Sequence, residues 1–277
     1  MRTLKGAALF EGVGLHSGKF ARVSIEPSFD GTVSFKTASG VFPLTSAVVE
    51  EDNRLTGFRL PDGTSVRTAE HLLASIAGME IDSALIELDG EEVPIGDGSA
   101  RPFVEAMAAA GICETGEKAA KRALAFPITI DEPESGRFIA AVPSCATRVT
   151  YVIDYPGTLV GTQRVTYEIN ADTFARVISG ARTFCLTQEL DYLKKHGLAL
   201  GGSLDNALVF GEDALLNDGG LRFPLEPVTH KVTDLIGDLL LAGPIPIAHY
   251  ICVCAGHGIH GKLADRLKRL FQAAPAA

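Results

Sequence analysis

Thr229–Gly243 reads THKVTDLIGDLLLAG, and this stretch predicts the helix around which the rest of the chain is organised. In a helix, His230, Asp234 and Asp238 stand at i, i+4 and i+8, so their side chains share one face. The other positions are largely apolar: Val232, Leu235, Ile236, Leu239, Leu240 and Leu241. Buried carboxylates and imidazoles must be paired or bound to a metal. This stretch alone leaves two interpretations open: half of a metal site, or a capping histidine with carboxylates bonded to nearby Lys or Arg.

Composition and charge are those of a globular protein without a nucleic-acid partner. The chain has 277 residues, of which 46% are hydrophobic and 21% charged. This length suffices for one large domain or for two smaller ones that each bury a core. The formal net charge is −9, and the basic residues are scattered. Since nucleic-acid phosphates are bound by clustered Lys and Arg, we expect no nucleic-acid partner.

Cysteine usage and hydropathy indicate a cytoplasmic protein. The five cysteines form no CxxC pair and their number is odd, so we expect reduced thiols. The apolar run from Leu235 to Ala255 contains Asp238, two prolines and His249, which favours helix, turn and strand over a membrane span. We therefore expect no transmembrane segment.

Hydrophobic periodicity predicts a mixture of strands and helices. Period-two alternation indicates strands, and an apolar stripe at i, i+3 and i+4 indicates a helix. The main predicted elements are strands at 21–26 and 32–37, a helix at 68–79, a strand at 83–88, a helix at 103–110, strands at 126–130, 138–142, 148–154 and 164–169, helices at 171–178 and 188–195, the helix in 229–243, a strand at 247–253 and a last helix after His257.

The two halves of the chain repeat one order of elements. TAEHLLASIAGMEIDSALIEL (68–88) predicts helix, connection and strand, and THKVTDLIGDLLLAGPIPIAHYICV (229–253) predicts the same. Equivalent helices of such a pseudo-repeat pack in a shared core, which would bring His71 close to His230 and Asp234. The charged stretch Lys118–Arg122 marks the boundary. We therefore predict two α+β domains, residues 1–118 and 123–277.

His71, His230 and Asp234 form a candidate metal site. Two imidazoles and one carboxylate with an open fourth position are typical of catalytic zinc, whereas structural zinc sites are closed. Glu70 adjoins a ligand without being one, as suits a general base. There is no HExxH motif of the zinc proteases.

His257 is a candidate for the acid of such a site. It lies in a glycine-flanked turn directly after a predicted strand, where a rigid scaffold can aim its side chain into a cleft. An imidazolium there could stabilise an oxyanion or protonate a leaving amine. Asp238, one helical turn beyond Asp234, could keep that imidazole protonated.

Seven motifs lie in one order along nearly the whole chain. They are GVGLHSG (12–18), TAEHLLASIAG (68–78), EVPIGDGSARPFV (92–104), ARTF (181–184), GLALGGSLDNA (197–207), LRFPLEPVTHKVTDLIGDL (221–239) and GHGIHGKL (256–263). Together they resemble the UDP-3-O-acyl-N-acetylglucosamine deacetylase family, the zinc amidases of lipid A biosynthesis in Gram-negative bacteria. Taken locally, the first motif indicates only a surface loop with a lone histidine, His16.

The resemblance implies a role for each matching residue. His71, His230 and Asp234 would be the zinc ligands, and Glu70 the general base. The other catalytic residues would be His257 as cationic acid, Asp238 as its support, and Thr183 as hydrogen-bond donor to the oxyanion. Substrate would contact Lys231, Phe184, Leu190, Gly202, Ser203 and Ala207, most of them in a pocket segment at 184–207.

The resemblance also implies a fold, a cofactor and a substrate. The family fold is two similar α+β domains, each a sheet with two helices, with the helices sandwiched between the sheets. We expect one Zn²⁺ per chain, although Fe²⁺ suits the same ligand set. The substrate would be a small acylated sugar nucleotide, bound by a cytoplasmic monomer.

The chain departs from the family pattern around the substrate. Cys254 stands where members usually carry a basic residue, His260 and Gly261 replace two asparagines, and Phe126–Pro127 lacks a common lysine. A diphosphate needs cationic or donor partners. The alternative is therefore a paralogous zinc deacetylase acting on another N-acyl amino sugar or nucleotide sugar. A third hypothesis is a non-catalytic zinc-binding relative.

Overall fold

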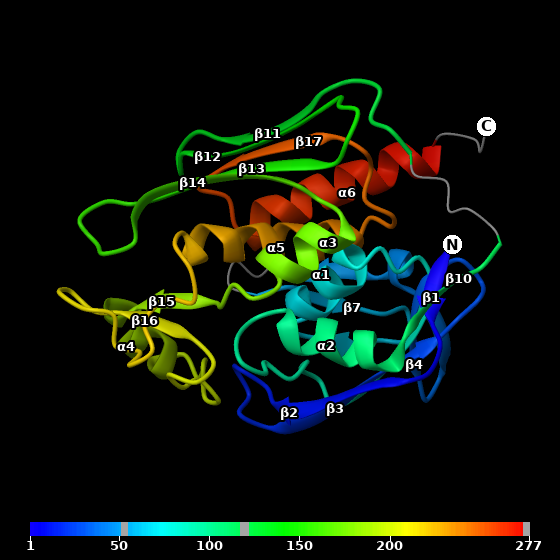
Figure 1. Ribbon diagram of the computed structural model, residues 1–277, viewed down its shortest axis with the longest axis horizontal. Coiled ribbons are helices and arrows are strands. Elements are labelled where there is room, and N and C mark those ends of the chain that lie inside the picture. Colours follow the sequence, from blue (N-terminus) through cyan, green and yellow to red (C-terminus); the bar gives the residue numbers. More distant parts are fainter. Residues whose placement is uncertain (51–54, 117–121, 274–277) are drawn as a thin grey trace.

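The computed structural model describes residues 1–50, 55–116 and 122–273 and shows four layers (Figure 1). Two sheets form the outer layers, and the helices lie between them. The inner helices are α1 (Glu70–Gly78), α2 (Arg101–Ala110), α5 (Glu226–Leu240) and α6 (His257–Ala273). The predicted α+β class, with helices sandwiched between sheets, is confirmed.

Each outer sheet has five strands in the same topological order. The first sheet runs β2 (Ala8–Val13), β3 (Phe20–Pro27), β9 (Ala84–Asp89), β4 (Val33–Thr37) and β5 (Gly40–Pro43). The second runs β11 (Ile128–Glu132), β12 (Arg137–Val142), β17 (His249–Val253), β13 (Arg148–Tyr155) and β14 (Gly161–Glu168). In both, the central strand pairs antiparallel on one side and parallel on the other. The second half thus repeats the first, as its sequence pattern predicts.

The helices occupy equivalent places in the two halves. Helix α1 precedes the central strand β9 and α2 follows it, just as α5 precedes β17 and α6 follows it. One continuous core joins them, since buried side chains such as Leu72 and Leu73 of α1 belong to the same cluster as Leu235 and Leu239 of α5. The predicted limits of the domains, 1–118 and 123–277, remain predictions, and residues 117–121 at their boundary lie outside the described part of the chain.

Shorter elements decorate this frame. At one side of the molecule, β15 (Phe184–Leu186), α4 (Thr187–Lys195) and β16 (Leu208–Phe210) form a projecting unit that contains the predicted pocket segment (Figure 1). The others are β1 (Arg2–Leu4) paired with β10 (Ile112–Glu114), the 3₁₀ turn η1 (Leu44–Ser46), the sheet of β6 (Val48–Glu50), β7 (Gly57–Arg59) and β8 (Ser65–Val66), and α3 (Ala171–Thr173) with the π-helical turn η2 (Phe174–Ile178).

Three of the inner helices are entered through a residue in left-handed backbone conformation. Thr68 (φ 53°) precedes α1, Leu225 (φ 62°) precedes α5, and Cys254 (φ 47°) precedes α6. Side chains other than glycine seldom adopt this conformation, because the Cβ atom crowds the backbone. The chain therefore turns sharply into each of these helices at a strained residue.

The interpretation of Gly12–Gly18 as a surface loop is wrong for its histidine, His16. The His16 side chain is buried, and its backbone N–H donates to Glu92 Oε1 at 2.8 Å. The His16 Nδ1 atom lies 3.3 Å from the backbone nitrogen of Ala199, in the projecting unit. A partner 183 residues away in sequence cannot be detected from a local pattern.

Among the described residues, no helix combines the length and apolar character needed to cross a membrane.

Helices α1 and α5 cross at backbone contact. A Cβ atom on Gly237 of α5 would lie 2.2 Å from the Glu70 carbonyl oxygen of α1. We expect Gly237→Ala to push the helices apart and to lower the free energy of unfolding by about 1–3 kcal/mol. Urea titration or thermal unfolding measures this loss. Gly219→Ala, at a position with no heavy atom within 4 Å of the added carbon, is the control. Equal stability of the two variants would contradict the close contact.

Candidate metal centre and active site

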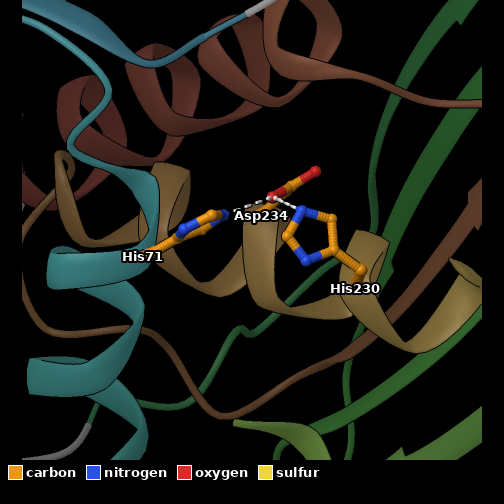
Figure 2. A group of neighbouring side chains, drawn as sticks. All are labelled: His71, His230 and Asp234. Carbon is orange, nitrogen blue, oxygen red and sulfur yellow. Dashed lines mark ion pairs between the residues drawn. The ribbon is translucent and has the colours of Figure 1, made fainter. Parts of the chain in front are cut away.

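Three predicted ligands meet where α1 and α5 cross. Figure 2 shows the two imidazole rings pointing at one carboxylate, His71 from α1 and His230 and Asp234 from α5. The Asp234 Oδ1 atom lies 3.2 Å from His230 Nε2 and 4.0 Å from His71 Nε2. Tetrahedral bonds of about 2 Å would place ligand atoms about 3.3 Å apart, so these separations suit one metal ion.

The chemistry of the donor atoms fits a cation. Asp234 Oδ1 is buried, and among the described residues no donor bonds to it, which is costly for a charged oxygen. His230 donates its Nδ1 proton to the Ala181 carbonyl at 3.0 Å, which leaves the Nε2 lone pair directed at Oδ1 and its neighbours. Two imidazole nitrogens that can each offer a lone pair, beside a carboxylate oxygen without a donor, form the set of ligands that a divalent cation requires.

Protonation states agree with this interpretation. Burial and the neighbouring His230 imidazole lower the pKa of His71 to about 3, so its ring is neutral. Burial favours protonation of Asp234, but His230 and Lys231 hold the pKa of this carboxyl well below its ordinary value. Lys231 Nζ donates to Asp234 Oδ2 at 2.8 Å. Asp234 therefore keeps one oxygen on Lys231 and the other free for a cation.

Glu70 is a buried carboxyl group beside the three ligands. Burial raises its pKa to about 7, an effect that the positive His257 partly offsets. The Thr56 backbone N–H donates to Glu70 Oε2 at 3.0 Å and so fixes one carboxyl oxygen. A group of this kind can take up and release a proton near neutral pH, as general acid–base chemistry requires.

His257 is the first residue of α6 and lines the same cavity as Glu70. Its Nδ1–H donates to Asp238 Oδ2 at 2.9 Å, and its Nε2 lies 3.9 Å from Asp234 Oδ2. Burial lowers the pKa of His257, but Asp238 outweighs it and raises the value to about 9. The imidazole is therefore a cation at neutral pH. The second carboxylate oxygen of Asp238 accepts a hydrogen bond from the Thr56 hydroxyl.

The segment that carries Thr183 is anchored to α5. Arg182 donates from its Nε to Glu226 at 2.8 Å, and this glutamate in the first turn of α5 is fully buried. The Thr183 backbone N–H donates to the Gly98 carbonyl at 2.7 Å. These contacts explain why the Ala181 carbonyl meets His230 and why Thr183 borders the site.

A cavity of about 690 Å³ opens onto these groups. Of the thirteen predicted site residues, twelve line it: Glu70, His71, Thr183, Phe184, Leu190, Gly202, Ser203, Ala207, His230, Lys231, Asp234 and His257. Asp238 is the exception, because it stands behind His257, away from the cavity. The structure thus brings the predicted residues together from both halves of the chain.

Sequence reasoning missed several residues of this cavity, Arg137 above all. Arg137 begins β12, and the register pairs the next residue, Phe138, with Val253 of β17. Arg137 and Cys254 are therefore the next residues along two paired strands, and both line the cavity. A cation thus stands beside the position at which Cys254 supplies none. Only the sheet register could have revealed this, since nothing in the β12 sequence pattern marks Arg137.

The fold and the site define a metal-dependent hydrolase: two imidazoles and a carboxylate line one cavity together with a buried carboxyl group and an imidazolium. The sequence model of the LpxC family, described as UDP-3-O-acyl N-acetylglycosamine deacetylase, matches residues 1–269. The chain belongs to this family of metalloenzymes.

Individual relatives agree over most of their length. A protein of Oleidesulfovibrio alaskensis is 39% identical over 264 residues, which cover 93% of this chain and 85% of the relative. A Nostoc protein is 40% identical over 97% of this chain and 98% of its own, and a Chlamydia pneumoniae protein is 40% identical over 92% of both. All three are named UDP-3-O-acyl-N-acetylglucosamine deacetylase.

We expect the purified protein to hold one transition-metal ion per chain, and Asp234→Asn to lose it, because the variant removes the carboxylate whose Oδ1 atom has no donor. Elemental analysis after gel filtration measures the metal content. A second cluster, Asp238 with His257 and His260, also groups three potential ligand atoms. His260→Asn is therefore the control and should keep the metal. If His260→Asn loses the metal and Asp234→Asn keeps it, the ion is bound by the second cluster, and the assignment to His71, His230 and Asp234 is wrong.

Proposed function

We propose that this chain is a zinc-dependent UDP-3-O-acyl-N-acetylglucosamine deacetylase of lipid A biosynthesis, acting as a cytoplasmic monomer. The observation that carries the proposal is that Glu70 and His257 line the same cavity as the three candidate ligands. All five cysteines are free thiols, which suits a reducing compartment. The three candidate ligands come from one chain, which suits a monomer.

His71, His230 and Asp234 would hold the ion. A bound Zn²⁺ would supply Lewis acidity, which polarises the amide carbonyl and acidifies water. Glu70 takes a proton from the attacking water as its oxygen bonds to the carbonyl carbon. The Thr183 hydroxyl donates a hydrogen bond to the oxygen that becomes negative.

Collapse of the tetrahedral intermediate needs a proton on the sugar nitrogen. His257, kept cationic by Asp238, donates that proton as the carbon–nitrogen bond breaks. The products are acetate and the free 2-amino sugar nucleotide. Glu70 then passes the proton that it gained to His257, directly or through water, so that both groups return to their starting protonation states.

The cavity walls suit the two ends of this substrate. Lys231, Arg137 and Lys194 supply three cations for a diphosphate. The side chains from the projecting unit and its neighbourhood are largely apolar and suit an acyl chain: Phe184, Leu190, Leu193, Leu204, Val209 and Leu216. This lining favours an acylated nucleotide over a simple N-acetyl sugar.

We expect the zinc-loaded protein to release acetate from UDP-3-O-acyl-N-acetylglucosamine, and Glu70→Ala and His257→Ala to lower kcat by about 10²–10⁴-fold each. Mass spectrometry of acetate and of the amino sugar nucleotide measures turnover. Asp172→Ala, an exposed ion-pair position on α3, is the control. A protein that ignores this compound but deacetylates a simpler N-acetyl sugar would favour the paralogue. A metal-loaded protein without any deacetylase activity would favour the non-catalytic relative.

Arg137 provides a separate test of diphosphate binding. Arg137→Ala should raise KM about tenfold with little change in kcat, since a charge-assisted hydrogen bond to phosphate contributes about 1.5 kcal/mol. The effect should vanish with an N-acetyl sugar that lacks the UDP group. Arg148→Ala, on β13 of the same sheet and paired with Glu168, is the matched control. An unchanged KM in the Arg137 variant would show that this cation does not meet the nucleotide.

A further inference from the structure

His260 is a fully buried histidine on α6, one turn after His257. The function proposed above gives it no task. Its Nδ1 lies 2.7 Å from Asp238 Oδ2, the same oxygen that accepts from His257 at 2.9 Å. Its Nε2 lies 2.9 Å from the hydroxyl of Tyr151, a fully buried residue of β13. Both ring nitrogens are therefore engaged.

The proton inventory fixes how these bonds are made. A carboxylate oxygen can only accept, so the Nδ1 of His260 carries a proton and donates it to Asp238. Burial lowers the pKa of His260, so the ring is neutral and its Nε2 accepts from the Tyr151 hydroxyl. Burial also raises the pKa of Tyr151, which therefore keeps its proton.

Tyr151 extends this chain of hydrogen bonds to the loop that carries His257. The Tyr151 hydroxyl also donates to the carbonyl oxygen of Ala255 at 2.9 Å, two residues before His257, so its one hydrogen is shared between this oxygen and His260 Nε2 in a three-centre hydrogen bond. The resulting ring runs from Asp238 on α5 through His260 on α6 and Tyr151 on β13 to the backbone beside His257. Three separate elements thus hold one imidazole in place.

Asp238 differs in this respect from the metal-ligand candidate Asp234. Its Oδ1 accepts from the Thr56 hydroxyl, and its Oδ2 accepts from two imidazoles. A carboxylate with all these donors has one orientation, whereas a carboxylate bonded to His257 alone could rotate with its partner. The second cluster is therefore saturated by protein donors and serves alignment.

We propose that His260, braced by Tyr151, is a positioning residue that fixes Asp238 and thereby the direction of His257. The inference rests on the proposed function, in which His257 delivers a proton to the leaving amine. An asparagine amide can replace the Nδ1 donor toward Asp238, but it is too short to reach Tyr151. The histidine therefore adds a second hydrogen bond, the one to Tyr151.

The two halves of the ring can be removed separately. An asparagine side chain places its NH₂ near the position of the imidazole Nδ1, and a glutamine side chain places its amide near the position of Nε2. His260→Asn therefore keeps the donor to Asp238, and His260→Gln keeps only the contact to Tyr151. Tyr151→Phe removes one hydroxyl. Tyr250→Phe is the matched control, because Tyr250 is equally buried and donates to the Pro246 carbonyl at 2.8 Å, away from the site.

Kinetics and histidine NMR of the zinc-loaded full chain test the proposal. We expect His260→Gln to lower kcat about tenfold with KM within twofold, and His260→Asn to stay within threefold of wild type. Tyr151→Phe should lower kcat about threefold, and Tyr250→Phe should not change it. In spectra of protein labelled with ¹⁵N-histidine, the His257 Nδ1–H resonance should persist in His260→Asn and shift or broaden in His260→Gln.

Two outcomes would overturn the proposal: equal kcat in the Asn and Gln variants, or equal losses in Tyr151→Phe and Tyr250→Phe, which would indicate general loosening. If His260→Gln does not fold, the comparison of Tyr151→Phe with Tyr250→Phe still tests the proposal. If the wild-type protein does not deacetylate the UDP sugar, the proposed function fails, but the NMR comparison needs no substrate and still tests the positioning.

Discussion

The structure depends on the contact between α1 and α5, where Gly237 lies against the Glu70 backbone. Side chains usually hold helices 8–10 Å apart, and a glycine lets them approach more closely. This approach brings His71 within reach of ligands that belong to the other half of the chain. The same crossing places Glu70 at the cavity. The helix contact therefore sets both the core and the chemistry, and neither half contains a complete site.

Around this crossing, the buried carboxylates differ in the hydrogen-bond donors that surround them. Asp234 and Asp238 stand one turn apart on α5 and are both buried, yet they differ in function because their donors differ. Lys231 occupies one oxygen of Asp234 and leaves the other for a cation. Thr56, His257 and His260 saturate Asp238. Two chemically identical side chains are thus suited to different tasks, Asp234 to bind a cation and Asp238 to support a positive imidazole.

Much of the fold and of the site follows from the sequence, because periodic apolar positions determine which face of a helix is buried. The stripe in α1 and the apolar character of α5 predicted two buried helices, and their repeat predicted that His71 and His230 approach each other. Other residues depend on partners that no local pattern encodes. Arg137 reaches the cavity through the β12–β17 register, and His260 meets Tyr151 from 109 positions away. Thr56 contacts Glu70 through its backbone N–H, a donor that every residue except proline possesses.

The left-handed residues at the entrances to α1, α5 and α6 bear on how such a protein can change over time. Thr68, Leu225 and Cys254 each hold a conformation that costs about 1–3 kcal/mol, and each lies one to three residues before a helix that carries candidate site residues. At these three positions, the orientation of the helix is therefore maintained at the expense of stability. Substitutions that relieve the strain at these residues would raise the stability of the protein. Selection would oppose them wherever the relaxed backbone turned a helix away from the candidate metal centre.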